Sequence, residues 1–187
     1  ITMDNVGVTK TAAYTGQAIG LQLRNSKVTF VASYLSGLFL GATATDQSEL
    51  DVDYSSFDNI DTQACRFFNA SKLITNHTTV AGLKGVKTGN EAEYEGSALF
   101  FKDSFFDLKN TLIAANKIGI MRKFVDRNET NTSFSITYSD IWNTDQNYIN
   151  LPDQTGLNHN ISADPLFGTS WCLAQGSPAV YGDTQLG

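Results

Sequence analysis

The feature that most constrains the fold is a short pattern that recurs along the chain at irregular intervals. A small residue precedes two apolar residues that a single residue separates, as in Gly20-Leu-Gln-Leu23 and Ala64-Cys-Arg-Phe67. Further copies begin at Gly37, Ala98 and Gly119, the last of them degenerate. The starts lie about 17 to 34 residues apart. Such spacing suits stacked short strands joined by turns of variable length, whereas helical repeat arrays have nearly fixed periods.

Each copy is followed by a second stretch in which apolar and polar residues alternate. Leu50-Asp-Val-Asp53 is the clearest of them. Because successive side chains of a strand point to opposite faces, the leucine and the valine should point inward and the two aspartates outward. The other stretches are Val28-Thr-Phe30, Leu73-Ile-Thr75, Leu108 to Ile113 and Phe134-Ser-Ile136. The two sets together predict strands that are stacked coil upon coil.

Residues that tolerate left-handed backbone follow several of the predicted strands, which predicts turns there. These residues are Asn5, Asn25, Asn69 and Asp103. In stacked coils they would form a ladder of side-chain hydrogen bonds that satisfies interior polar groups. Phenylalanine also occurs as adjacent pairs within predicted strands, so one ring of each pair should fill the core and the other should face outward. The pairs are Phe67-Phe68, Phe100-Phe101 and Phe105-Phe106.

The last third of the chain carries the most specific motifs. Ile136-Thr-Tyr-Ser-Asp-Ile141 is followed by Asn160-Ile-Ser-Ala-Asp-Pro-Leu-Phe167 and then by Leu173-Ala-Gln-Gly-Ser-Pro-Ala179. Together these segments resemble the closing part of right-handed parallel β-helix proteins, the pectate-lyase-like superfamily. The resemblance implies an all-β fold, a right-handed parallel β-helix solenoid of about five coils. We expect the coils over residues 1–142, and a last part coil with a C-terminal cap over residues 143–187.

The resemblance also sets expectations for the two ends of the solenoid. Asp164 should accept a hydrogen bond from a backbone N–H of the turn that it opens before Pro165. Four large side chains should be buried there and plug the last coil: Leu166, Phe167, Trp171 and Leu173. No cap is visible at the N-terminal end. Further coils or a partner subunit are therefore expected there, and self-association through this uncapped end is one possibility.

Composition excludes several classes of partner. The net charge is −6 and only 17% of the residues are charged, which argues against nucleic acid and against an anionic membrane surface. No apolar run approaches the roughly 20 residues of a membrane span, so we expect no membrane insertion. The two cysteines, Cys65 and Cys172, do not make a disulfide scaffold. Together with the resemblance, this composition predicts an extracellular or cell-surface protein.

The scaffold does not specify a reaction, because β-helix proteins include lyases, hydrolases, adhesins and inert surface rods. The Gly-His-Gly and Arg-x-Lys motifs of β-helix hydrolases are absent from this chain. We therefore expect a non-catalytic module that is structural or adhesive and that binds, if anything, a polysaccharide or a cell-surface partner. Two alternatives stay open: a polysaccharide lyase or glycoside hydrolase, and a subunit of a self-assembling fibre, sheath or surface layer.

If the chain is an enzyme, its candidate catalytic residues are Asp51, Asp53 and Arg122. The two aspartates share an outward strand face, and paired carboxylates act as general acid and base on glycosidic bonds. Arg122 opens the densest basic stretch, and an arginine fork matches the carboxylate of an acidic sugar. The alternative reading is that all three are solvated surface charges. No cofactor is expected, although a weak calcium site that adds Asp58 or Asp61 is a minor alternative.

Two further features point to the surface of a secreted protein. The long segments 81–97 and 143–160 are candidate functional loops, because loops on a rigid solenoid often carry binding residues. Five Asn-x-Ser/Thr sequons are candidate glycosylation sites: Asn69, Asn76, Asn128, Asn131 and Asn160.

Overall fold

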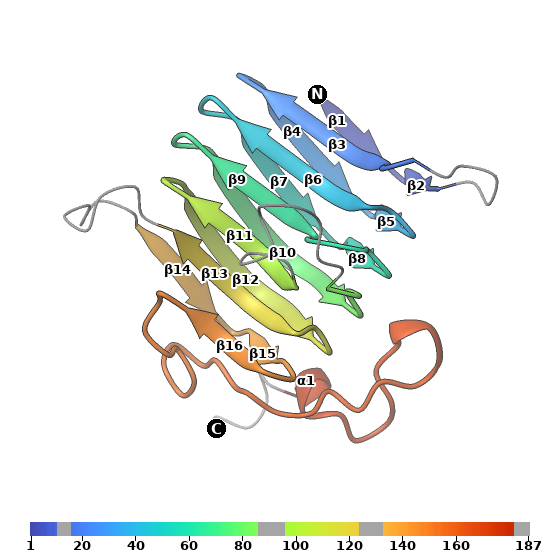
Figure 1. The fold of residues 1–187 in the computed structure, drawn as a ribbon. Helices are drawn as coiled ribbons and strands as arrows, with labels where there is room; N and C mark the ends of the chain where they lie inside the picture. The colour runs from blue at the N-terminus through green and yellow to red at the C-terminus, as the bar shows by residue number, and fades with distance from the viewer. Residues whose placement is uncertain (11–15, 86–95, 124–132, 182–187) are drawn as a thin grey trace.

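The computed structural model describes residues 1–10, 16–85, 96–123 and 133–181, and the statements below concern these ranges. It confirms the predicted fold class: parallel strands stack into a β-solenoid of about five turns (Figure 1). The described residues are nearly all strand and turn. The helical segments among them are one 3-10 turn, η2 (Thr169–Trp171), and the four-residue α1 (Pro178–Tyr181), both in the C-terminal tail.

The strands form two parallel sheets, which we call sheet A and sheet B. Sheet A contains β1 (Thr2–Asp4), β2 (Gly7–Thr9), β4 (Lys27–Val31), β5 (Tyr34–Ser36), β7 (Glu49–Asp53), β8 (Ser56–Asp58), β10 (Lys72–Ala81), β12 (Phe105–Ala114), β14 (Phe134–Thr137) and β15 (Asp140–Trp142). Sheet B contains β3 (Ile19–Arg24), β6 (Leu40–Thr45), β9 (Cys65–Phe68), β11 (Ser97–Lys102), β13 (Ile118–Lys123) and β16 (Gln146–Ile149).

The predicted alternation and most of the predicted repeat are confirmed. Leu50 and Val52 are fully buried, and the alternate residues Asp51 and Asp53 lie half-buried on the outer face. In sheet B, the copies at Gly20, Ala64, Ala98 and Gly119 stand in one register, because Leu21, Ala42, Cys65, Leu99 and Ile120 are successive partners. The copy at Gly37 is wrong by four residues, since the strand begins at Leu40 and Gly41 takes the place of Gly20. The inward residues of this strand are alanines. The run Leu38-Phe-Leu40 therefore matches the apolar pattern of the repeat better than the strand does.

One ring of each phenylalanine pair lies in the core, as predicted. Phe67, Phe101, Phe106 and Phe134 form a continuous aromatic stack across the interior, with ring centres 5.6, 4.4 and 5.3 Å apart. The second rings do not stand exposed. Phe68 and Phe105 are half-buried, and Phe100 is buried in a smaller cluster with Ile118 and Met121.

Ladders of polar side chains line the corners of the coils, but the main ladder differs from the predicted one. Asn25, Asn69 and Asp103 do adopt left-handed backbone at one corner of the coils. However, the side chains that accept backbone N–H groups of the neighbouring coil belong to serines that follow such corners. A shorter asparagine ladder runs elsewhere, where Asn116 Nδ2 donates to Asn143 Oδ1 at 3.0 Å and Asn143 Nδ2 donates to Asn147 Oδ1 at 3.3 Å. Part of the expected loop 143–160 is therefore strand, because Asn147 belongs to β16, which pairs with β13.

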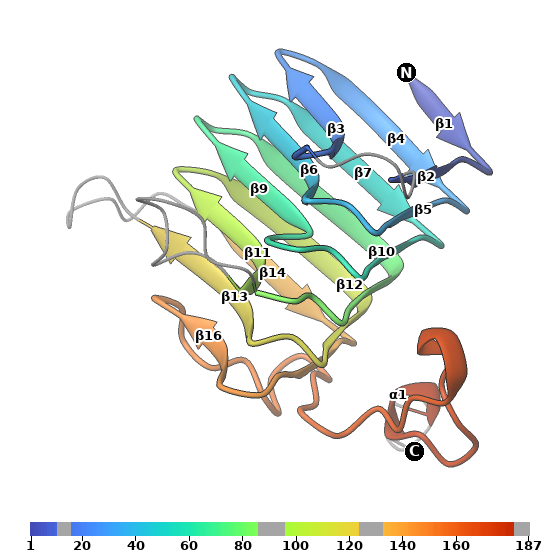
Figure 2. The ribbon, with the colours of Figure 1, turned by 45° about the vertical axis from the view of Figure 1, so that its right-hand side comes forward.

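The C-terminal tail does not plug the core as expected. Asp164 Oδ1 accepts the N–H of Leu166 at 2.9 Å, which confirms the predicted turn. However, Leu166 is 45% exposed, and Phe167, Trp171 and Leu173 are only half-buried. Tyr148 and Leu151 pack against the core instead. The tail leaves the last coil and lies beside the ends of β10 and β12 (Figure 2). Motifs of apolar residues identified the segment, but they do not show which surface it covers.

The small residue of the repeat is required by close packing between coils, which gives a testable prediction. A Cβ atom on Gly41 would collide with the carbonyl oxygen of Ala64 and lie 2.9 Å from Ile60 Cδ1. Gly41→Ala should therefore lower the free energy of unfolding by about 1–3 kcal/mol, the usual cost of overpacking. Urea unfolding measures it. Gly168→Ala is the control, because a Cβ there meets its nearest atom at 3.6 Å; equal effects at the two sites would contradict this explanation.

Candidate functional site

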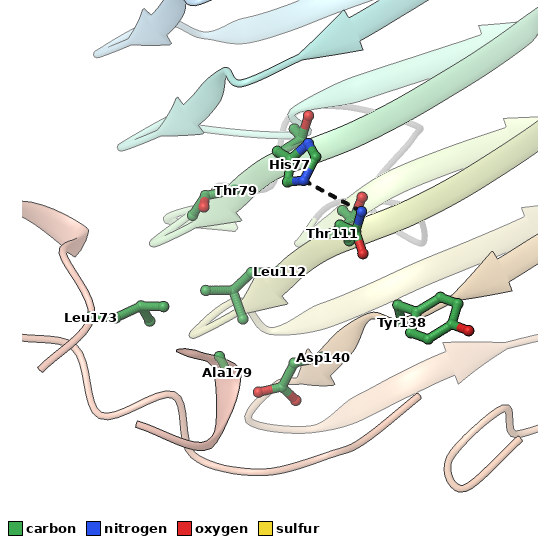
Figure 3. A pocket seen from close by; sticks show the side chains of 10 residues that line it. His77, Thr79, Thr111, Leu112, Tyr138, Asp140, Leu173 and Ala179 are labelled. Carbon is green, nitrogen blue, oxygen red and sulfur yellow. Dashed lines mark hydrogen bonds between the residues drawn. The ribbon is translucent and has the colours of Figure 1, made fainter. Parts of the chain in front are cut away.

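The candidate site is a cleft of about 380 Å³ between the outer face of sheet A and the C-terminal tail. Strands β10, β12 and β15 supply one wall, through His77, Asn110 and Asp140 among others. The tail supplies the other wall through Leu173 and Ala179, and Figure 3 shows both across from the strands. This volume lies within the roughly 300–1,000 Å³ of small-molecule sites.

The cleft follows a corner at which each coil bends within sheet A. One residue per coil has a positive φ there, and the residues stand in register from coil to coil. Asn5 holds this place in the first coil, and we call the set from the next coil onward the corner column: Ala32, Tyr54, His77, Asn110, Tyr138 and His159. Their N–H groups bond onward to the next coil, as when Tyr138 N–H donates to Asn158 O at 3.0 Å. Left-handed backbone is uncommon for large side chains, so the two tyrosines at this corner are notable.

A buried polar residue follows each member of the corner column and holds the bend. Ser139 is an example: its Oγ donates to Thr137 O at 2.8 Å and accepts the N–H of Thr111 at 3.1 Å. Its own N–H donates to Asn160 Oδ1 at 3.1 Å. The same pair of bonds, from a hydroxyl to the carbonyl two residues back and from the neighbouring N–H, recurs at Ser33. These bonds satisfy backbone groups that the bend leaves without strand partners and make the wall of the cleft rigid.

Aromatic rings of the corner column stack between successive coils. Tyr54 lies on His77, with ring centres 4.4 Å apart and planes 6° apart. Tyr138 lies on His159 in the same way, at 4.6 Å and 10°. Asp53 joins the first stack, because its Oδ1 is 3.5 Å from His77 Nδ1 and accepts Asn76 Nδ2 at 3.2 Å.

Asp140 is the most perturbed group in the cleft. Only 5% of the residue is exposed. Its Oδ1 accepts the N–H of Ala163 at 3.1 Å, but its Oδ2 has no hydrogen-bond partner among the described residues. Burial raises the pKa of this carboxyl to about 6, and the nearby charge of Asp164 acts in the same direction. A carboxyl that changes protonation near neutral pH at the base of a cleft is a functional-site candidate.

The structure separates the three predicted catalytic residues. Asp51 and Asp53 lie half-buried on the outer face of β7, and Asp53 borders the cleft through His77. Arg122 lies in sheet B at the register position of Phe101, inside the solenoid. It is 7% exposed, its guanidinium carbon is 5.7 Å from the ring centre of Phe134, and burial lowers its pKa. It therefore does not share a face with the two aspartates.

The residues of Asn143-Thr-Asp145 bond to neighbouring turns. Asn143 Nδ2 donates to Ile113 O at 3.1 Å, and Thr144 Oγ1 donates to Asn116 O at 3.1 Å. Asp145 Oδ2 lies 4.0 Å from Lys117 Nζ. Within the described ranges, no three His, Cys, Asp or Glu side chains gather in a way that could hold a metal ion. The two aspartates suggested for calcium face Ser36 Oγ, in the case of Asp58, and Lys84 Nζ, in the case of Asp61.

The sequons differ in what the folded chain offers. Asn69 is exposed, whereas Asn76 is half-buried and donates to Asp53. Asn160 is 1% exposed, its Nδ2 donates to Ile136 O at 2.8 Å, and its Oδ1 accepts Ser139 N–H, so the folded chain presents no free amide there. Asn128 and Asn131 lie outside the described residues, as do residues 86–95 of the other predicted loop.

Sequence reasoning missed the residues that line the cleft, although a local signal marks them. Each corner residue is followed directly by a serine, a threonine or an asparagine, as in His77-Thr78, Asn110-Thr111 and Tyr138-Ser139. If each such dipeptide marks a bend, His77, Asn110 and Tyr138 are expected along one edge of the coils. No such signal marks Asp140, because its burial depends on where the tail lies.

Comparison with known proteins found no match: no protein-family model, no curated protein and no solved structure matches this chain. Within the ranges that the structure describes, no helix has the length and apolarity that a membrane crossing requires.

Proposed function

We propose that this chain is a non-catalytic module of a secreted or cell-surface protein, of the pectate-lyase-like type that its tail motifs resemble, and that it binds a polysaccharide in the cleft on sheet A. The observation that carries the proposal is the chemistry of the cleft. Its described lining combines an aromatic ring at Tyr138, an amide at Asn110 and the hydroxyl of Thr79 beside the apolar Leu112 and Leu173. Hydroxyl-rich ligands with apolar C–H faces match such a mixture.

The charge of the cleft favours a neutral polysaccharide over a uronate. Asp140 is the one carboxylate among the described residues that line the cleft, and Asp53 lies 3.5 Å from His77, another residue of the lining. An ionised sugar would be repelled by these groups and by the net charge of −6. Arg122, the cation proposed to grip a carboxylated sugar, faces the interior instead.

The test is a binding screen of the purified chain against neutral glucan, xylan and mannan and against polygalacturonate and alginate, with and without calcium. We expect at least one neutral polymer to bind and its chain length to stay unchanged on prolonged incubation. Asp140 favours the rival enzymatic function, because a carboxyl with a raised pKa suits a general acid. Turnover that Asp140→Asn abolishes would establish a lyase or hydrolase and overturn our proposal.

Self-assembly is the second rival. Strands β1, β2 and β3 each have a neighbour on one side only among the described strands, and Ile19 in β3 is 45% exposed. Such edges are able to pair with a second copy. Light scattering measures the molar mass of the purified chain at increasing concentration. A molar mass that grows with concentration would favour self-assembly, whereas the binding module needs no association.

A further inference from the structure

The aromatic ring of Tyr138 has one covered face and one face turned toward the cleft. His159 belongs to the coil after Tyr138 and covers the ring on that side. The opposite face of Tyr138 therefore points to the preceding coil, where Asn110 occupies the corner column. Both residues line the cleft. Tyr138 is 41% exposed, and Figure 3 shows its ring.

Asn110 leaves room above that ring and offers a hydrogen-bond acceptor. Its Nδ2 donates to Asn76 Oδ1 at 3.0 Å and lies 3.5 Å from His77 Nε2, so the amide group is drawn toward the coil before it. Its Oδ1 accepts no hydrogen bond from the described residues. His77 and Tyr138 are two coils apart, a separation of roughly 9–10 Å at the usual strand spacing, and between them only a short amide side chain stands in the column.

We propose that Tyr138 and Asn110 form a subsite for one sugar ring, which stacks its C–H face on the free face of Tyr138 and donates a hydroxyl to Asn110 Oδ1. The inference rests on the proposed function and specifies how that cleft holds its ligand. A pyranose has a weakly polar C–H face and a rim of hydroxyls. An aromatic face next to an unsatisfied amide acceptor complements both parts.

The stack also sets the direction of the bound chain. Tyr138 and His159 come from successive coils and lie nearly parallel, so the normal of the tyrosine ring runs along the solenoid axis. A sugar stacked on it lies across that axis. Because the glycosidic bonds of an extended chain lie close to the plane of its rings, the polymer then runs along the strands, from the corner toward Leu173 and Ala179, rather than down the axis.

The corner backbone at Tyr138 does not by itself require an aromatic ring. Its φ is 51°, a conformation that large L side chains seldom adopt and that Asn110 and Ala32 fill in the same column at 48° and 47°. The bend itself therefore does not need a tyrosine. Tyr54 adopts the same backbone, at a φ of 47°, outside the lining of the cleft, so the position of Tyr138 in the cleft, and not its backbone, distinguishes it.

The test uses hexasaccharides of neutral glucan, xylan and mannan as probes in titration calorimetry. Tyr138→Asn should weaken the binding of the probe that wild type binds best by at least tenfold, which is about 1.4 kcal/mol, while Tyr138→Phe should stay within about twofold because the stacking face remains. The matched control is Tyr54→Asn. Tyr54 has the same corner backbone and is stacked on a histidine of its own, His77, but does not line the cleft.

Each outcome is decisive. Unchanged affinity of Tyr138→Asn for a probe that wild type binds would overturn the subsite and leave the proposed function standing. Equal losses in Tyr138→Asn and Tyr54→Asn would also overturn it, since the effect would then belong to the corner and not to the cleft. If wild type binds none of the probes or polymers, the proposed function fails and the subsite fails with it. Thermal melts of all variants identify any loss that comes from unfolding.

Discussion

Replacing Phe101 by alanine should lower the free energy of unfolding by about 3–5 kcal/mol, the usual range for truncating a fully buried aromatic side chain. The residue is 1% exposed. Its ring contacts Phe67 on one side and Phe106 on the other, at 5.6 and 4.4 Å between ring centres. Parallel strands on both sides fix these rings, so the interior has little freedom to close the cavity. Equilibrium unfolding in urea measures the loss.

Phe167→Ala is the matched comparison. Phe167 is half-buried in the tail, where its ring meets Trp171 edge-on, with ring centres 5.1 Å apart. We expect a loss of about 1 kcal/mol, the centre of the distribution for single substitutions. If Phe167→Ala cost as much as Phe101→Ala, the tail would be part of the core after all, as its motifs suggested.

Asp140 should make the chain less stable as the pH rises from 3.8 to about 6. Its carboxyl has a pKa of about 6 in the fold against an ordinary value of 3.8, so the folded state holds the proton more tightly than the unfolded state. The penalty is absent below pH 3.8, grows between pH 3.8 and 6, and is complete above pH 6. A shift of this size corresponds to about 2–3 kcal/mol. Asp164 faces the same group and adds to the effect.

The variant Asp140→Asn isolates this term, because it removes the charge and keeps an oxygen to accept the N–H of Ala163. The stability of wild type relative to the variant should fall by about 2–3 kcal/mol between pH 4 and pH 7.5, as followed by thermal melts. Asp107→Asn removes an exposed carboxylate from the same sheet and should leave the wild-type slope unchanged. Parallel pH profiles for wild type and Asp140→Asn would show that Asp140 is not desolvated.

Local alternation was enough to predict the strands, because side chains of a buried strand repeat every two residues whatever the rest of the chain does. Leu50 and Val52 illustrate this, and so does the register of four of the five repeat copies. Gly41 was missed since alanines pack the interior there, and alanine carries little of the apolar signal on which the prediction depended.

The cleft could not be predicted in the same way, because it depends on contacts between distant segments. In the sequence, Asp140 is one residue of a short strand. Its burial comes from Ala163 and the tail, which are distant in the chain. The basic stretch that Arg122 opens predicts a cation for an acidic sugar or a solvated surface charge, yet the coil register places Arg122 among the inward positions of sheet B. Tail motifs identified Asp164 as a turn residue, since that bond is local, but they did not show that Trp171 lies against Gly82 rather than over the last coil.

The most direct test of the proposed binding cleft is a crystal structure of the chain with the neutral oligosaccharide that binds it best. We predict an intact sugar chain on the outer face of sheet A, with one ring stacked on Tyr138 and the chain running along the strands toward Leu173. An oligosaccharide bound on sheet B, or one cleaved next to Asp140, would contradict the binding cleft proposed for this solenoid.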